Sequence, residues 1–183
     1  MSGLVTMGKG VAGGRARYQP PPALVGRSAR TRPEEPGARL PRISLELSRR
    51  CNLRCAYCYS NASPEARVGL TDAEVRQVID EAVALGACVI SIVGGGESLL
   101  RRSILVDGGS CIDHANALGC YCYLYTNCTL VDAGAARWLA RRDVTVVGKL
   151  NSLRDEVQED LAGVRGSSSS IRRGIDALLE AGL

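Results

Sequence analysis

Four short apolar runs alternate along the chain with stretches whose apolar residues recur every three or four positions. Short runs rich in β-branched and aromatic side chains predict strands, and the 3.6-residue periodicity predicts helices. The run at 88–93 is apolar at almost every position, which is typical of a buried parallel strand. The predicted strands are 43–47, 88–93, 121–125 and 144–150, and the predicted helices are 71–85, 110–118, 132–142, 153–161 and 171–181.

Local signals set several boundaries of these helices. Thr71 and Glu74 form a T-x-x-E capping box that begins a helix, and Gly86 ends that helix. Asp132 is a candidate N-cap. Residues 106–109 interrupt the periodicity and are predicted to form a loop. Because strands and helices alternate, the chain is predicted to be an α/β protein with a parallel sheet, whose ligands bind at the carboxyl ends of the strands.

Charge and proline are concentrated at the N-terminus. Residues 1–42 hold eight Lys and Arg and two Glu, a net charge of +6, so the rest carries −2 of the total of +4. Six of the seven prolines lie there as well. We therefore predict a disordered basic tail rich in Pro and Gly over 1–41 and a folded core over 42–183. The tail could contact RNA, a membrane or an acidic partner; the simpler alternatives are a solvated tail or an over-extended start codon.

The composition also bears on location and partners. No apolar run approaches the roughly 20 residues needed to span a membrane, and no signal peptide is visible, so no membrane association is expected. The nearly neutral core does not indicate nucleic-acid binding. With eight cysteines and no secretion signal, the expected location is a reducing cytoplasm.

Three cysteines follow the first predicted strand in a C-x3-C-x2-C spacing, at Cys51, Cys55 and Cys58. Closely spaced thiolates favour iron–sulfur or zinc sites. Structural zinc sites usually use paired C-x2–4-C units, and no second pair stands out. Electron-transfer [4Fe–4S] clusters are held by four cysteines. Three thiolates would leave one iron open, and substrate chemistry could occur at that position.

The stretch ELSRRCNLRCAYCYSNA, residues 46–62, resembles the signature of the radical S-adenosylmethionine (SAM) superfamily. The resemblance implies that Cys51, Cys55 and Cys58 bind three irons of a [4Fe–4S] cluster, while SAM chelates the fourth. It implies reductive cleavage of SAM to methionine and a 5′-deoxyadenosyl radical, with an electron from a flavodoxin- or ferredoxin-type reductant. Tyr57, before the third cysteine, is expected near the adenine; simple packing is the alternative. The implied fold is a partial (β/α)6 barrel with parallel strands.

The glycine turn after the second predicted strand carries a second resemblance. Gly94, Gly95, Gly96 and Glu97 are similar to the family's GGE motif, which meets the SAM amino group. Glycines suit this role because they let a backbone approach a ligand closely. Ser98 stands where relatives usually have proline, so the loop conformation is less fixed.

Polar residues at the next two strand ends are further candidates for binding SAM or substrate. Thr126 and Asn127 resemble a TNG-type turn in which Cys128 replaces the glycine. Asn151 and Ser152 follow the fourth strand, where relatives contact the SAM carboxylate or ribose. Turn capping is the alternative for Thr126 and Asn127, and helix capping is the alternative for Ser152.

Five other cysteines have no predicted role in the cluster. We expect them to be buried small hydrophobes; a second metal site at the C-x-C pair is the alternative. They are Cys88, Cys111, Cys120, Cys122 and Cys128.

Four strand–helix units are about two short of the family's barrel. We therefore expect the N-terminal part of a radical SAM core, either truncated or completed by a partner or by self-association, with an open sheet edge at the fourth strand. The alternative function is a non-catalytic iron–sulfur module, such as an electron carrier or a nonfunctional fragment. The substrate, a peptide or a small molecule, is not specified by the sequence; the motif is loosely similar to that of peptide-modifying maturases.

Overall fold

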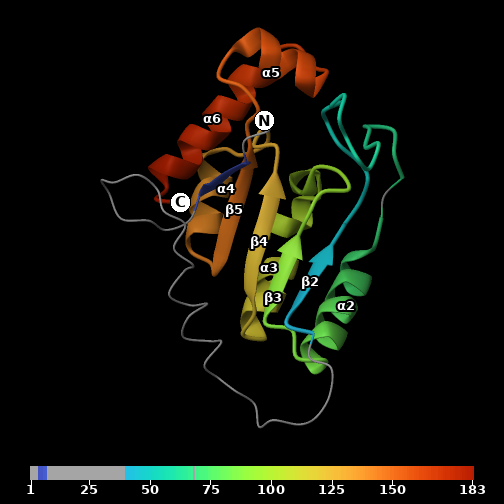
Figure 1. The fold of residues 1–183 in the computed structure, drawn as a ribbon. Coiled ribbons are helices and arrows are strands. Elements are labelled where there is room, and N and C mark those ends of the chain that lie inside the picture. The colour runs from blue at the N-terminus through green and yellow to red at the C-terminus, as the bar shows by residue number, and fades with distance from the viewer. Residues whose placement is uncertain (1–3, 8–39, 68) are drawn as a thin grey trace.

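The computed structural model describes residues 4–7, 40–67 and 69–183, which form a five-stranded sheet with helices packed on it (Figure 1). The strand order is β1-β5-β4-β3-β2. Strands β2 to β5 are parallel, and β1 is antiparallel to β5, so the predicted α/β class with four parallel strands is confirmed. The strands are β1 (Leu4–Met7), β2 (Arg42–Leu45), β3 (Val89–Ile92), β4 (Tyr121–Thr126) and β5 (Val144–Lys149).

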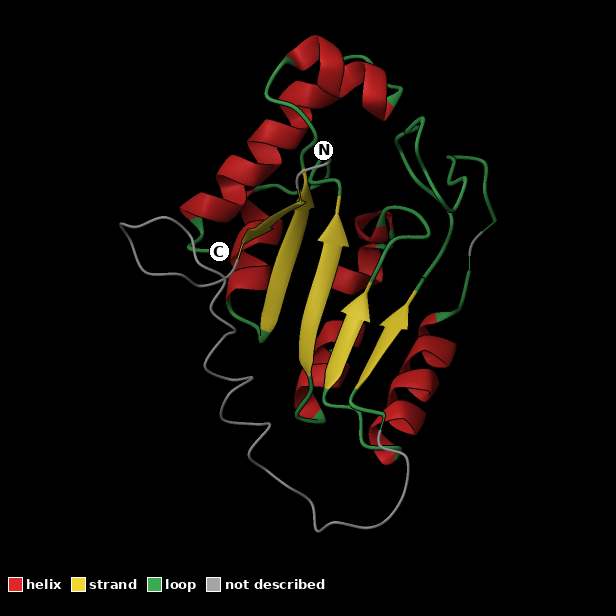
Figure 2. Ribbon diagram, in the orientation of Figure 1, coloured by secondary structure: helices red, strands yellow, loops and turns green. Residues whose placement is uncertain are grey.

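The helices of the described residues cover one face and one end of this sheet (Figure 2). Helices α2, α3, α4 and α6 supply the core residues of the covered face, and α5 lies beyond the strand ends to which the arrows point. None of these helices is long and apolar enough to cross a membrane. They are α2 (Asp72–Ala84), α3 (Cys111–Ala117), α4 (Ala133–Ala140), α5 (Asp155–Ala162) and α6 (Ser167–Glu180), with 3₁₀ helices at Ser98–Leu100 and Arg102–Leu105.

Helix boundaries follow the local signals with one clear exception. The side chain of Thr71 accepts the Glu74 N–H, and the Glu74 carboxylate accepts the Thr71 N–H, so the predicted capping box is confirmed. Helix α6 begins at Ser167, four residues before its predicted start. Serine is a weak helix former, but the Ser168 hydroxyl donates to Asp155 at 2.6 Å, which ties this turn to α5.

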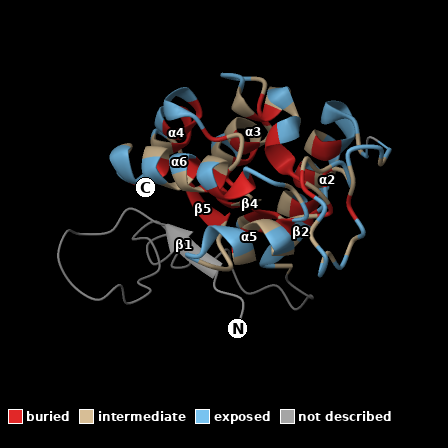
Figure 3. Cartoon of the chain, turned by 90° about the horizontal axis from the view of Figure 1, so that it is seen from above, coloured by how far each residue is buried: buried red, intermediate tan, exposed pale blue. Residues whose placement is uncertain are grey.

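The two faces of the sheet differ in chemistry, because successive side chains of a strand point to opposite sides. Along β4, Cys122 and Leu124 pack into the large aliphatic core beneath the helices. Tyr121 and Tyr123 lie on the other face with Val147. Figure 3 shows the buried strands β4 and β5 beneath the helices α3, α4 and α6. The helices are thus held by an aliphatic core on one side of the sheet.

The predicted disordered tail falls mainly on residues 8–39, which lie outside the described residues. The prediction is wrong for Leu4–Met7, which form β1 and pair with β5 from Lys149 to Val146. The edge of the fourth parallel strand, predicted to be open, is therefore paired. The physical reason is that a strand edge presents free N–H and C=O groups to any nearby extended segment.

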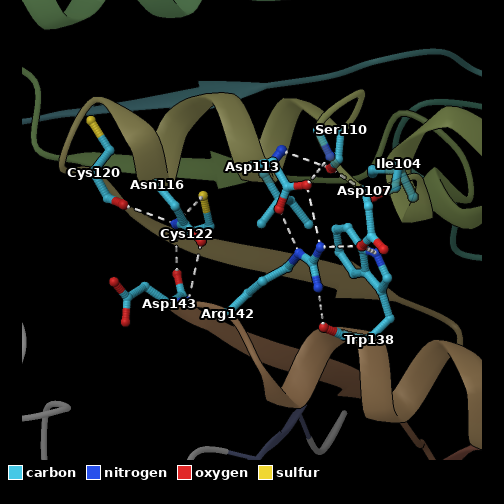
Figure 4. Close-up of polar contacts among 12 residues, drawn as sticks. Ile104, Asp107, Ser110, Asp113, Asn116, Cys120, Cys122, Trp138, Arg142 and Asp143 are labelled. Carbon is cyan, nitrogen blue, oxygen red and sulfur yellow. Dashed lines mark hydrogen bonds and ion pairs between the residues drawn. The ribbon is translucent and has the colours of Figure 1, made fainter.

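A polar network ties α4 and Arg142 to α3 and the segment before it, at the amino ends of β4 and β5 (Figure 4). The Arg142 guanidinium contacts Asp113 at 2.5 Å and Asp107 at 2.6 Å, and it lies 3.2 Å from the centre of the Trp138 ring. Trp138 Nε1 donates to the same Asp107 carboxylate at 2.7 Å. Because Arg142 is largely buried, these contacts compensate for the desolvation of its charge.

Candidate functional site

The predicted motifs meet at one edge of the sheet. The cysteines of 51–58 follow β2, the glycine loop 94–97 follows β3, residues 126–127 end β4, and residues 151–152 follow β5. Because these strands are parallel, their carboxyl ends lie side by side, at the upper end of the sheet in Figure 1. This edge is where ligands bind in open α/β sheets.

The three motif cysteines are free thiols on one partly buried loop. The Leu53 N–H donates to Cys51 Sγ at 3.4 Å, and the Ala62 N–H donates to Cys58 Sγ at 3.3 Å. Such N–H···S contacts favour a sulfur that carries negative charge. The backbone of the loop is therefore arranged to support thiolates at two of the three positions.

The thiols of this loop differ in acidity. Burial raises the pKa of Cys51, and the Leu53 N–H only partly offsets that effect. Burial also acts to raise the pKa of Cys58, but the Ser60 hydroxyl and the nearby main-chain N–H groups outweigh it and lower the pKa. Cys58 is thus the more readily ionised of the two.

The sulfur atoms do not converge into a ready metal site. Across 4–7, 40–67 and 69–183, no group of three or more His, Cys, Asp or Glu side chains is arranged to hold a metal ion. The donor set still fits an iron–sulfur cluster, because three soft, disulfide-free thiols share one loop and two of them receive N–H hydrogen bonds. The assignment of Cys51, Cys55 and Cys58 as ligands stays a prediction.

The glycine loop is hydrogen-bonded directly to the cysteine loop, the segment 46–67 that follows β2 and carries the three motif cysteines. The Gly95 N–H donates to the Tyr59 hydroxyl at 3.2 Å, and the Ser60 hydroxyl donates to the Gly95 carbonyl. A Cβ on Gly94 would lie 3.0 Å from the Tyr59 hydroxyl oxygen. These glycines therefore allow a side-chain contact with the neighbouring loop as well as the predicted approach of a ligand.

Gly96 has the tightest surroundings in this loop. A Cβ on Gly96 would lie 1.9 Å from the carbonyl oxygen of Arg50, a separation that no side chain tolerates. The next N–H, that of Glu97, donates to the same Arg50 carbonyl at 2.8 Å. Glycine is required here because two backbones touch.

The Glu97 side chain is buried beneath this loop and points toward β4. Its Oε1 accepts from the Leu99 N–H at 3.0 Å and from the Thr126 hydroxyl at 2.8 Å, and its Oε2 accepts from the Asn127 N–H at 2.7 Å. Burial raises the pKa of Glu97, whereas these three donors favour the ionised form. The carboxylate joins the glycine loop to the predicted Thr126–Asn127 turn.

Asn52 and Thr129 belong to the site although the sequence analysis did not select them. Asn52 Nδ2 donates to Thr129 Oγ1 at 2.7 Å, and Asn127 Nδ2 donates to Asn52 Oδ1 at 2.9 Å. The only signal in the sequence was the place of Asn52 between two predicted ligands. Cys128 adopts φ = +64°, the left-handed conformation that a TNG-type turn would give to glycine.

Tyr57 meets the end of β5. Asn151 Nδ2 donates to the Tyr57 hydroxyl, and Lys149 Nζ lies 4.4 Å from the centre of the Tyr57 ring. Burial, with the neighbouring Cys55 and Cys58 thiols, raises the pKa of Tyr57 to about 12 against the effect of the Asn151 donor. Asn151 Oδ1 is buried and has no partner among the described residues, which leaves an acceptor for a ligand.

Ser152 takes part in a turn. Its hydroxyl accepts the Arg154 N–H at 3.1 Å. The alternative of helix capping by Ser152 is wrong, because Arg154 is the N-cap of α5 and no side chain caps that helix. Gln158, a buried residue of α5 that sequence reasoning missed, accepts the N–H groups of Asn151 at 2.8 Å and Ser152 at 3.1 Å. The signal that could have identified Gln158 is its position as a polar residue on the buried side of a predicted helix.

The cysteine loop also docks on the C-terminal end of α5. The Arg54 N–H donates to the Ala162 carbonyl at 2.9 Å, and the Ala56 N–H donates to the Leu161 carbonyl at 3.2 Å. Gly163 ends the helix with φ = +66°, and a Cβ there would lie 2.3 Å from the Arg54 carbonyl oxygen. The helix thus fixes the backbone between the first two cysteines.

The remaining cysteines are mostly packed in the interior. Cys120, Cys122 and Cys128 are buried members of the main core, as predicted for small apolar residues. Burial raises the pKa of Cys111 to about 11, so that thiol stays protonated near neutral pH. Cys88 is exposed, contrary to the prediction, because it precedes β3 at the surface.

Comparisons with known proteins agree on one family. A family model described as the radical SAM superfamily matches residues 45–183. The chain is 31% identical over 154 residues to the AdoMet-dependent heme synthase of Oleidesulfovibrio alaskensis, covering 81% of this chain and 37% of that protein. It is 34% identical over 122 residues to the PqqA peptide cyclase of a Methylobacterium species, covering 66% and 29%. The chain spans about a third of the length of these curated relatives.

Solved structures share the fold. SuiB of Streptococcus suis bound to S-adenosylmethionine superposes with a TM-score of 0.61 at 21% identity, over 78% of this chain and 32% of that chain. Native anSMEcpe with bound AdoMet and Kp18Cys peptide gives a TM-score of 0.61 at 20% identity, over 78% of this chain and 42% of that chain. At this identity the likeness establishes the shared architecture.

Proposed function

The chain belongs to the radical SAM superfamily, and we propose that it forms the part of a catalytic core that binds a [4Fe–4S] cluster and SAM. Cys51, Cys55 and Cys58 would hold three irons of the cluster. When bound, cluster and SAM supply the chemistry of one-electron cleavage, which yields methionine and a 5′-deoxyadenosyl radical. One observation carries the proposal: three free thiols follow β2 at the strand edge where the other predicted motifs meet.

The surrounding residues divide into two proposed roles. The backbone of Gly94, Gly95 and Gly96, together with the Tyr57–Asn151 pair, would contact SAM, since Asn151 Oδ1 offers a buried acceptor of the kind that a ribose hydroxyl uses. The Glu97 carboxylate would hold the glycine loop in place, because its oxygens already accept three protein hydrogen bonds.

The two remaining side chains at the strand ends support this arrangement. Thr126 would position Glu97, to which it donates. Ser152 would shape the turn after β5 through its contact with the Arg154 N–H, while Asn151 donates to the Tyr57 hydroxyl.

Substrate and reductant are proposed from the relatives. One curated relative is named a PqqA peptide cyclase, and one solved neighbour is SuiB bound to the precursor peptide SuiA. Another relative is named a heme synthase. We therefore propose a peptide or a small molecule as substrate, and a flavodoxin- or ferredoxin-type protein as electron donor. A reducing cytoplasm would suit both the cluster and the free thiols.

The test is SAM cleavage by the anaerobically reconstituted chain. Iron and sulfide content and 5′-deoxyadenosine formation are measured after reduction with dithionite. The proposal expects a cluster and product in the wild type and in Cys88→Ala, and neither in Cys55→Ala. A cluster without product would favour the alternative, a non-catalytic iron–sulfur module. Unchanged iron binding in Cys55→Ala would contradict the ligand assignment.

A further inference from the structure

Three side chains at the site form a closed ring of hydrogen bonds. Asn127 Nδ2 donates to Asn52 Oδ1 at 2.9 Å, Asn52 Nδ2 donates to Thr129 Oγ1 at 2.7 Å, and Thr129 Oγ1 donates to Asn127 Oδ1 at 2.6 Å. Each side chain donates once and accepts once within the ring, an arrangement in which hydrogen bonds reinforce one another. The ring joins the cysteine loop to the turn after β4.

The main chain fixes the direction of the Asn127 amide. The Thr129 N–H contacts Asn127 Oδ1 at 3.0 Å. A main-chain N–H can only donate, so the atom that it meets must be the amide oxygen. The amide nitrogen must then face the other way, toward Cys51, and Nδ2 lies 3.9 Å from Cys51 Sγ.

The backbone of Asn127 is anchored as firmly as its side chain. Its N–H donates to Glu97 Oε2 at 2.7 Å, and that carboxylate is buried and also bonded to Thr126. The distance from Asn127 to the Cys51 sulfur is therefore set by contacts on both sides of the residue.

Resting on the proposed function, we infer that Asn127 is a positioning residue for the cluster, whose amide N–H is held against the sulfur of Cys51 by Asn52 and Thr129. A donor at that sulfur stabilises the negative charge that reduction adds. Hydrogen bonds to cluster sulfurs are one of the factors that set the reduction potential. Asn127 thereby raises the potential at which the cluster accepts its electron. This role differs from direct contact with SAM.

The test is the midpoint potential of the reconstituted cluster, followed by its spectrum at a series of applied potentials. Asn127→Ala removes the donor, and Thr129→Val loosens the ring without touching the sulfur. Asn116→Ala is the matched control, because the Asn116 amide bonds the carbonyls of Cys120 at 3.0 Å and Asp143 at 3.2 Å at the opposite end of the sheet. All variants are made in the full chain.

The expected result is a lower potential in the two site variants alone. At a fixed applied potential, Asn127→Ala should lower the ratio of reduced to oxidised cluster about tenfold, which is about 59 mV for a one-electron couple. Thr129→Val should give a smaller shift, and Thr129→Ser, which keeps the hydroxyl, should restore the wild-type value. Asn116→Ala should leave the potential unchanged while lowering the thermal stability.

Three results would overturn the inference. The first is an unchanged midpoint potential in both Asn127→Ala and Thr129→Val, while the wild-type chain holds an intact cluster. That result would leave the proposed function unaffected. The second is an equal shift in Asn116→Ala. The third, a wild-type chain that takes up no iron, overturns the proposed function with it. If Asn127→Ala fails to fold, the potential of Thr129→Val decides.

Discussion

At the scale of single residues, the site depends on Glu97. No ion pair with this buried carboxylate is found in the part of the chain that the structure describes. Burying a charge without a partner is costly unless hydrogen bonds replace its hydration. Leu99, Thr126 and Asn127 supply those bonds. The main-chain N–H of Leu99 donates to one carboxylate oxygen and that of Asn127 donates to the other, so both terminal atoms of the side chain at position 97 must be acceptors.

Glu97→Gln should therefore destabilise the fold although it preserves shape. The glutamine NH₂ group would face a main-chain N–H in either orientation, and a buried donor without an acceptor costs about 1–3 kcal/mol. The measurement is urea unfolding of the full chain. Glu180→Gln, at an exposed position of α6, is the control and should change the free energy of unfolding by less than about 0.5 kcal/mol. Equal stability of the two variants would contradict this role of Glu97.

The residues of the candidate site could be predicted from the sequence where a motif lies within a few neighbouring positions. The spacing of the cysteines and the run of glycines lie within a few positions, so the sequence alone located both loops. The ring contact between Asn52 and Thr129 spans 77 residues, and that between Asn52 and Asn127 spans 75. Such pairs depend on how the strands are ordered, which periodicity does not specify.

At the scale of elements, α5 is the support of the cysteine loop. The last carbonyls of a helix lack partners within the helix. In this protein the N–H groups of Arg54 and Ala56 bond to two of them, at Ala162 and Leu161. The left-handed Gly163 then lets the loop pass close to the helix end. The loop and the helix end therefore stabilise each other.

Gly163→Ala should cost more than the same change three residues later. Both Gly163 and Gly166 have positive φ, which costs an alanine about 1–2 kcal/mol. Only at Gly163 would the added Cβ meet a backbone atom, the Arg54 oxygen at 2.3 Å; nothing lies within 4 Å at Gly166. The overlap should add about 1–3 kcal/mol.

Urea unfolding of Gly163→Ala and Gly166→Ala measures this difference directly. The conformational cost is common to both variants, so any excess at position 163 reports the contact with the cysteine loop. Equal free energies of unfolding would show that this contact is not required.

Elements with strong local signals were predicted well. The capping box at Thr71 placed the start of α2, and alternation along the sequence gave the four parallel strands. The first turn of α6 was missed because its serines form a helix only with Asp155 of α5 beside them. Strand β1 was missed because four residues in a basic tail gain their pairing from the distant β5.

At the scale of the whole molecule, the two ends of the sheet have separate tasks. At the amino ends, the Arg142–Asp107–Asp113 network and Trp138 hold the helical layer. At the carboxyl ends, the segments that follow β3, β4 and β5 are each hydrogen-bonded to the cysteine loop, which follows β2. The sequence pattern predicted the site at the carboxyl ends, because parallel strands place these ends together, but it did not indicate the network at the amino ends. It did not give the positions of the three sulfurs, which depend on the conformation of a loop without regular secondary structure.

Electron paramagnetic resonance of the reduced, anaerobically reconstituted chain, recorded with and without SAM, tests the central claim most directly. If Cys51, Cys55 and Cys58 hold a cluster with one open iron, a [4Fe–4S]⁺ signal should appear and should shift when SAM is added. A signal that ignores SAM, or the absence of any cluster signal, would contradict the account.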